Sequence, residues 1–107
     1  MKLLTRQEEL VLLTVYAMNE PAVLTDIQDR LINRTGKEWS ISSVYVPLDR
    51  LAEDGYLSAT IGKPEARRGG KAKKYYELTE TGIVKLKELR TLTESFWKEV
   101  EGLAFEG

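Results

Sequence analysis

The sequence predicts a mainly helical α+β domain with a single β-hairpin. Three observations lead to this fold class: apolar residues recur at helical spacing, the pattern changes to strict alternation on both sides of a glycine-bearing loop, and the last stretch carries a heptad repeat. A chain of 107 residues has the length of one domain. We therefore expect a compact head over residues 1–79 and a C-terminal helix over residues 80–107 that belongs to the same compact domain.

Composition narrows the function classes. The chain is 42% hydrophobic and 31% charged, as is usual for a soluble globular protein, and it has neither cysteine nor histidine. Disulfides, thiolate metal sites and the commonest general base are therefore excluded. With no nucleophile–base pair or phosphate loop in view, we expect no enzyme, cofactor or metal. The longest apolar run, residues 10–18, is too short to span a bilayer, and no cleavage site follows it, so we expect a cytoplasmic protein.

Residues 6–19 predict the first helix, which Pro21 ends. Thr5 and Glu8 have the spacing of a capping box. Its apolar residues form one stripe of Leu10, Leu13 and Ala17 and a further surface of Val11, Leu12 and Val15. A helix that is apolar on more than one face should be deeply buried, and part of it should join an interface.

Residues 26–35 predict the second helix, with Thr25 and Gln28 as a second capping box and Gly36 as its C-terminal stop. Trp39 lies in the turn that follows, where we expect its side chain to pack against other residues rather than to have a functional role.

Residues 42–54 predict the third helix, closed by Gly55 and with Pro47 inside it, where a bend is expected. Its inward stripe, at spacings of three, four and three, consists of Ile41, Val44, Leu48 and Leu51. Ser42 is a candidate cap. The side chains left for the outer face are Ser42, Ser43, Tyr45, Val46, Asp49 and Arg50.

The period changes to two in residues 56–61 and 73–79, which predicts a hairpin with a long tip. Leu57, Ala59 and Ile61 share one face of the first strand, and Tyr76 and Leu78 should point inward from the second.

Positive charge is concentrated in this hairpin. In residues 62–76, six cations against Glu65 give +5, so the remainder carries −6 of the total −1. A polyanion senses this local patch because distant charges are screened beyond about 8 Å at physiological salt. The candidate contact residues of the loop are Lys63, Arg67, Arg68, Gly69, Gly70, Lys71, Lys73 and Lys74.

A fourth helix should begin after Thr79 and continue to Glu101. Its a/d seam consists of Gly82, Leu86, Leu89, Thr93, Phe96, Val100 and Leu103. Such a seam predicts dimerisation, with packing on the helix's own domain as the alternative. The residues expected in the dimer interface are Leu86, Leu89, Phe96, Val100 and Leu103.

The order helix, helix, turn, helix, hairpin, helix is that of a winged helix-turn-helix, in which the third helix enters the major groove of DNA. The outer face of the third helix offers polar side chains that can hydrogen-bond to base edges and a valine that can contact the thymine methyl. The candidate base readers are therefore Ser42, Ser43, Tyr45, Val46 and Arg50. The alternative is an interaction module whose basic wing binds an acidic protein. A purely electrostatic partner would not need serines and a tyrosine on the third helix, which favours DNA.

Two stretches, "SSVYVPLDRLAEDGYLSA" and "GKPEARRGGKAKKYYELTETG", resemble the PadR family of bacterial transcriptional regulators in its short, single-domain form. The resemblance covers residues 41–82. The chain departs from the family pattern where Val46 stands between Tyr45 and Pro47, and where Val23-Leu24 replaces a Tyr-Gly pair at the entry to the second helix.

The resemblance implies a DNA-binding homodimer on a near-palindromic operator, usually a repressor, and often one that responds to a small molecule. Some members place an aromatic residue of the last helix in a cavity between protomers that admits flat apolar compounds. By that likeness Phe96 and Trp97 are candidates to line a pocket for an aromatic or cationic apolar effector, and a packed Trp97 is the alternative.

Overall fold

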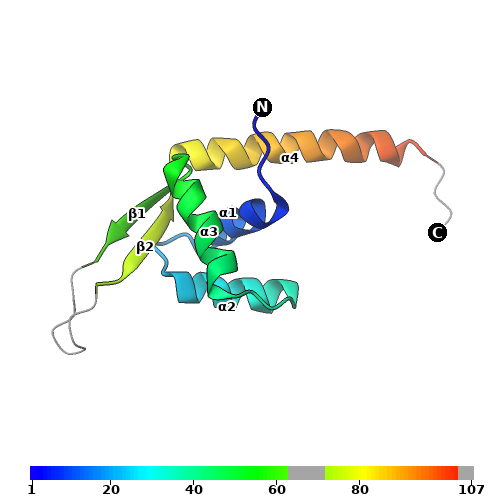
Figure 1. Ribbon diagram of the computed structural model, residues 1–107. Helices are drawn as coiled ribbons and strands as arrows, with labels where there is room; N and C mark the ends of the chain where they lie inside the picture. The colour runs from blue at the N-terminus through cyan, green and yellow to red at the C-terminus, as the bar shows by residue number, and fades with distance from the viewer. Residues whose placement is uncertain (63–71, 104–107) are drawn as a thin grey trace.

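Four helices and one antiparallel hairpin make up the part of the chain that this computed structural model describes, residues 1–62 and 72–103 (Figure 1). The elements are α1 (Arg6–Met18), α2 (Leu24–Thr35), α3 (Ile41–Glu53), β1 (Leu57–Ile61), β2 (Lys74–Leu78) and α4 (Glu80–Glu101). Their order is the predicted one, and the α+β winged-helix fold class is confirmed. Residues 63–71, which hold most of the predicted wing, lie outside the described residues.

The predicted capping box of α1 is confirmed. Thr5 Oγ1 accepts a hydrogen bond from the Glu8 amide at 3.1 Å, and the Glu8 carboxylate accepts one from the Thr5 amide at 2.8 Å. Asn19 ends the helix in the left-handed region at φ 53°. Both ends of α1 are therefore fixed by local contacts.

The predicted start of α2 is wrong. The helix begins at Leu24 after Val23, which makes no side-chain cap, so Thr25 lies inside the first turn. Gln28 does not complete a capping box. Its side-chain amide donates instead to the Trp39 carbonyl at 2.7 Å and ties α2 to the turn before α3. The expected stop at Gly36 is confirmed, with φ 70°.

The third helix begins one residue earlier than predicted. Ser40, rather than Ser42, caps it, because Ser40 Oγ accepts from the Ser43 amide at 3.1 Å. The helix continues through Pro47 to Glu53, and Gly55 follows at φ 84°.

One hydrophobic core joins all six elements. It consists of Val11, Leu12, Val15, Ala22, Ile27, Leu31, Trp39, Val44, Leu48, Leu51, Leu57, Tyr76 and Leu86. For α1 the buried face is that of Val11, Leu12 and Val15, whereas Leu13 and Ala17 are exposed. The expected burial of α1 is therefore met on one face within the protomer, and burial of the other face in an interface stays a prediction. Its second apolar face is left uncovered.

The hairpin pairs Leu57 with Leu78 and Ile61 with Lys74. Tyr76 is buried and Leu78 half-buried, as predicted, but Ala59 and Ile61 are exposed because the hairpin extends past the core. Ala22 adds an unpredicted third partner. It exchanges two backbone hydrogen bonds with Tyr76, at 2.9 and 2.8 Å, and so anchors the hairpin to the α1–α2 connection.

Helix α4 starts at a tight junction with the end of α3. Thr79 Oγ1 accepts from the Gly82 amide at 3.0 Å and donates to the Gly55 carbonyl at 2.7 Å. Gly82 lies so close that a β-carbon there would collide with the Tyr56 carbonyl oxygen. The junction therefore joins the start of α4 firmly to the C-terminal end of α3.

Candidate nucleic-acid interface

The pair α2–α3 forms a helix-turn-helix beside the hairpin. Figure 1 shows the hairpin pointing away from α4, toward the side of the molecule where α2 lies. Val44, Leu48 and Leu51 attach α3 to the core, which leaves the opposite side of α3 to solvent. This exposed side of α3 is the candidate DNA-reading surface.

Four of the five predicted base readers lie on that surface. Tyr45 is 44% exposed, and Ser42, Val46 and Arg50 are also exposed. Ser43 differs because it is half-buried and its hydroxyl donates to the Ser40 carbonyl at 2.8 Å. Only the lone pairs of Ser43 are left for a base.

The serines of the first turn bind one another. Ser40 Oγ receives the Ser43 amide and lies 3.3 Å from Ser42 Oγ. These contacts satisfy backbone groups that a helix N-terminus otherwise leaves unpaired. The hydroxyls at this end of α3 therefore serve the helix before they serve a ligand.

The prediction that Ile41 points inward is wrong. Ile41 is 62% exposed, although it stands seven residues, about two turns, before the fully buried Leu48. Periodicity gives the direction of a side chain around the helix, but not where the neighbouring core ends. The first turn of α3 extends past that core, so Ile41 is exposed at the N-terminal end of the helix, next to the candidate DNA-reading surface.

Trp39 packs, as expected. It is buried, and its indole N–H donates to Thr35 Oγ1 at 3.0 Å. Lys37, a residue that the sequence did not single out, places its ammonium 5.3 Å from the centre of the Trp39 ring. A cation in the turn before the third helix is the sequence signal that could have added Lys37 to the candidate phosphate contacts.

Only the base of the predicted wing is described. Lys73 and Lys74 are exposed there, with the Lys74 ammonium 5.5 Å from the Tyr76 ring centre, and the Gly62 amide donates to the Lys73 carbonyl at 2.8 Å. The other candidate wing residues lie outside the described residues; they are Lys63, Arg67, Arg68, Gly69, Gly70 and Lys71.

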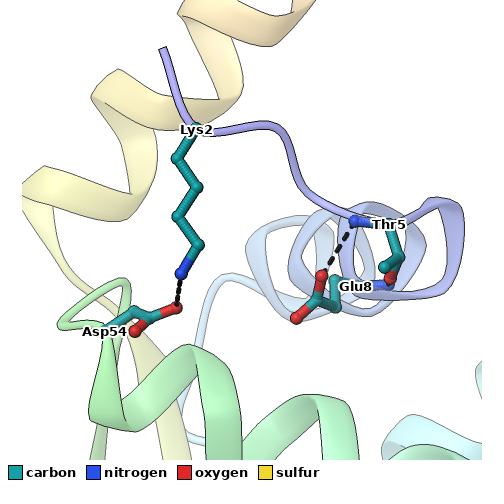
Figure 2. A network of polar contacts seen from close by, with 4 residues as sticks. All are labelled: Lys2, Thr5, Glu8 and Asp54. Atoms are coloured by element: carbon teal, nitrogen blue, oxygen red, sulfur yellow. Dashed lines mark hydrogen bonds and ion pairs between the residues drawn. The ribbon is translucent and has the colours of Figure 1, made fainter.

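Acidic side chains occur in the second half of α3. Asp49 is half-buried and Glu53 is exposed. Asp54 is paired, since its carboxylate accepts from the Lys2 ammonium at 2.9 Å (Figure 2). That hydrogen bond and the charge of Asp54 raise the pKa of Lys2 above its ordinary value. The acids disfavour phosphate near the end of α3, so its first two turns suit the groove better.

The seam of α4 divides into two halves. Leu86 and Leu89 are buried within the protomer, where α4 packs against α1. Phe96 is 62% and Trp97 61% exposed, and Val100 and Leu103 are exposed as well. In Figure 1 this half of α4 extends past the other helices. Packing within the chain therefore accounts for the first half of the seam and leaves the second half uncovered.

Other kinds of site find no support in residues 1–62 and 72–103. That part of the chain brings together no group of three carboxylates that could hold a metal ion. None of its helices combines the length and the apolar composition needed to cross a membrane.

Comparison with known proteins assigns the family. The model of the transcriptional regulator PadR-like family matches residues 12–88. A PadR-like transcription factor from Bacteroides fragilis is 28% identical, with 91% of this chain and 88% of that chain covered and a TM-score of 0.75. No curated protein matched the chain.

Two further solved structures share the fold. A PadR family transcriptional regulator from Eggerthella lenta is 24% identical over 91% of this chain and 82% of that chain, with a TM-score of 0.72. A PadR-like transcriptional regulator from Bacillus cereus is 21% identical over 94% and 92%, with a TM-score of 0.68. The family regulates transcription, which agrees with the expectation that this chain is not an enzyme. With the family model matching most of its length, this chain belongs to the PadR-like family of DNA-binding transcriptional regulators.

Proposed function

We propose that the protein is a homodimeric repressor that binds a near-palindromic operator through α3 and the wing and is released by a small molecule. The observation that carries the proposal is the uncovered side of α3, where Tyr45, Val46 and Arg50 stand beside a basic hairpin. Helix side chains of this kind read base edges, while cations on a wing bind phosphates. Repression is proposed because the likeness to the PadR-like family implies it.

A dimer would cover the apolar surfaces that the protomer leaves open. Besides the second half of α4, these include Leu13 and Tyr16 of α1, which line a shallow groove together with Leu86 and Arg90 of α4. Two DNA-binding heads related by a two-fold axis require half-sites about one helical turn, or a multiple of it, apart.

Replacing Tyr45 with alanine should narrow the affinity gap between operator and random DNA by about tenfold or more, because discriminating base contacts are worth about 1–3 kcal/mol each. The measurement is a titration of the DNA upstream of the protein's own gene against a scrambled duplex of equal length. Tyr45→Phe removes only the phenol hydroxyl, so it distinguishes the contribution of the hydroxyl to the affinity gap from that of the ring. Since Tyr45 is 44% exposed, both variants should keep the thermal stability of the parent. An unchanged gap in Tyr45→Ala would exclude Tyr45 as a base reader.

The same proposal assigns an effector site to Phe96 and Trp97. Neither ring is packed within the protomer, and two large aromatic side chains exposed side by side suit a flat apolar or cationic apolar compound. Such a ligand releases DNA only when it binds the DNA-incompetent arrangement more tightly than the competent one.

Titration with a panel of aromatic and cationic apolar compounds should change the fluorescence of Trp97. Trp39 also emits, but it is buried in the core, so the difference between the parent protein and Trp97→Phe isolates the Trp97 signal. An active compound should also weaken operator binding in the parent and have less effect in Trp97→Phe. If every compound that releases DNA does so equally in both proteins, the effector does not bind at Trp97.

A further inference from the structure

Ile41 is exposed at the N-terminal end of α3, next to the candidate DNA-reading surface, and packing within the protomer does not account for it. It is the first residue of α3 and is 62% exposed, while the other apolar residues of its predicted stripe, Val44, Leu48 and Leu51, are fully buried. A branched apolar side chain in that position adds nothing to the core. Its exposure is accounted for if the side chain is covered when the protein binds its target.

The neighbouring hydroxyls do not compete with Ile41 for this role. Ser43 donates to the Ser40 carbonyl, and the Ser40 hydroxyl receives the Ser43 amide and lies next to that of Ser42. Because these groups complete the helix cap, Ile41 is the side chain of the first turn that is exposed and has no hydrogen bond to make.

The location selects the kind of group that Ile41 meets. N-terminal residues of a recognition helix contact base edges in the major groove. An isoleucine has no donor for a phosphate or for a base acceptor. The apolar group that the major groove presents is the C5-methyl of thymine.

Tyr45 and the acids of α3 support this location. Tyr45 follows Ile41 by four residues, so the two side chains lie on the same side of α3, one turn apart. Asp49 and Glu53 come in the later turns, where they disfavour close approach to phosphates. The end of α3 that can enter the groove most deeply is therefore the end that carries Ile41.

We infer that Ile41 is a specificity-determining residue that contacts the C5-methyl of a thymine in each half-site. The inference rests on the proposed use of α3 as the recognition helix, and it adds a defined base to that proposal. The contact makes an A·T pair preferred at one operator position without any hydrogen bond.

The test begins with selection of binding sequences from a pool of random duplexes by the parent protein and by Ile41→Ala. Both motifs should agree except at one thymine column per half-site, which Ile41→Ala should lose. In synthetic duplexes of the selected sequence, deoxyuracil then replaces that thymine and removes only the methyl group. This should weaken the parent about fourfold per half-site, which corresponds to about 0.8 kcal/mol at 1.4 kcal/mol per tenfold. The affinity of Ile41→Ala should not change.

Two further variants control the experiment. Ile41→Val keeps a branched side chain and should keep the sensitivity to deoxyuracil. Val84→Ala shortens an exposed apolar side chain near the start of α4, which meets the opposite end of α3 from Ile41, and should behave as the parent does.

Three outcomes would overturn the inference: two of them leave the proposed function standing, and the third removes it as well. An enriched motif that Ile41→Ala leaves intact, or equal losses with deoxyuracil in the parent and Ile41→Ala, would overturn it alone. If the parent enriches no sequence at all, the proposed function fails together with it.

Discussion

Replacing Phe96 and Val100 together with lysine should convert the proposed dimer into a folded monomer. Both side chains are exposed in the protomer, so the variant should fold, whereas a dimer seam would bury both of them. Burial of an apolar side chain is worth about 1.5 kcal/mol or more, and a dimer would lose four such side chains. Association should weaken by about 6 kcal/mol, roughly four orders of magnitude. Sedimentation velocity and operator titration would measure the two consequences, monomers and the loss of two-headed binding.

The matched control is Thr91→Lys with Ser95→Lys. It adds the same charge at the same spacing, at exposed positions of α4 on the side away from the seam. It should stay dimeric and should bind DNA as the parent does. Dimers that persist in the Phe96/Val100 variant would remove the second half of α4 from the interface. Leu89 is a poor choice for this test because it is buried within the protomer, where a lysine would unfold the chain.

The seam of α4 could be predicted from the sequence only in part. The heptad repeat runs from Leu86 to Leu103 and is interrupted only by Thr93, and the helix it predicts is confirmed from Glu80 to Glu101. What covers each half depends on the length of α1, which packs against Leu86 and Leu89 but leaves Phe96 exposed. A repeat in one helix carries no information about the length of its neighbour.

The predicted helix caps also differ in whether the sequence alone determines them. The Thr5–Glu8 capping box and the start of α4 after Thr79 are confirmed, because the capping contacts of both residues lie within three residues. Gln28 failed as a capping residue because its amide binds the Trp39 carbonyl, eleven residues away. Local chemistry could be predicted from the sequence, and competition from a distant partner could not.

The candidate site follows the same rule. Tyr45, Val46 and Arg50 were predicted correctly to be exposed, because helical periodicity sets the direction of a side chain. Ile41 was placed wrongly because the extent of the core is a tertiary property. Ser43 was placed on the surface without its hydrogen bond to Ser40, which depends on the helix starting one residue earlier than predicted.

Replacing Arg67 and Arg68 with alanine should lower affinity for operator and random DNA alike. Both residues lie outside the described part of the chain, so this prediction rests on the +5 charge of residues 62–76. If each arginine neutralises one phosphate, a dimer loses four contacts. The slope of log affinity against log salt should then shrink by about 3 to 4, at about 0.9 per phosphate on duplex DNA.

Variants of α3 and variants of the wing should change different quantities, and this difference tests whether the wing binds phosphates. Variants of Tyr45 should change the ratio of operator to random binding and leave the salt slope nearly unchanged, because base contacts release few counterions. The matched control for charge is Lys87→Ala with Lys98→Ala, which removes two exposed cations of α4 and should leave the slope as it is.

An arginine that enters a narrow minor groove also favours A·T tracts, so a modest loss of shape preference would accompany the smaller slope. A full slope in the Arg67/Arg68 variant would mean that the wing does not bind phosphates. The positive charge of residues 62–76 would then suit an acidic protein partner better than DNA.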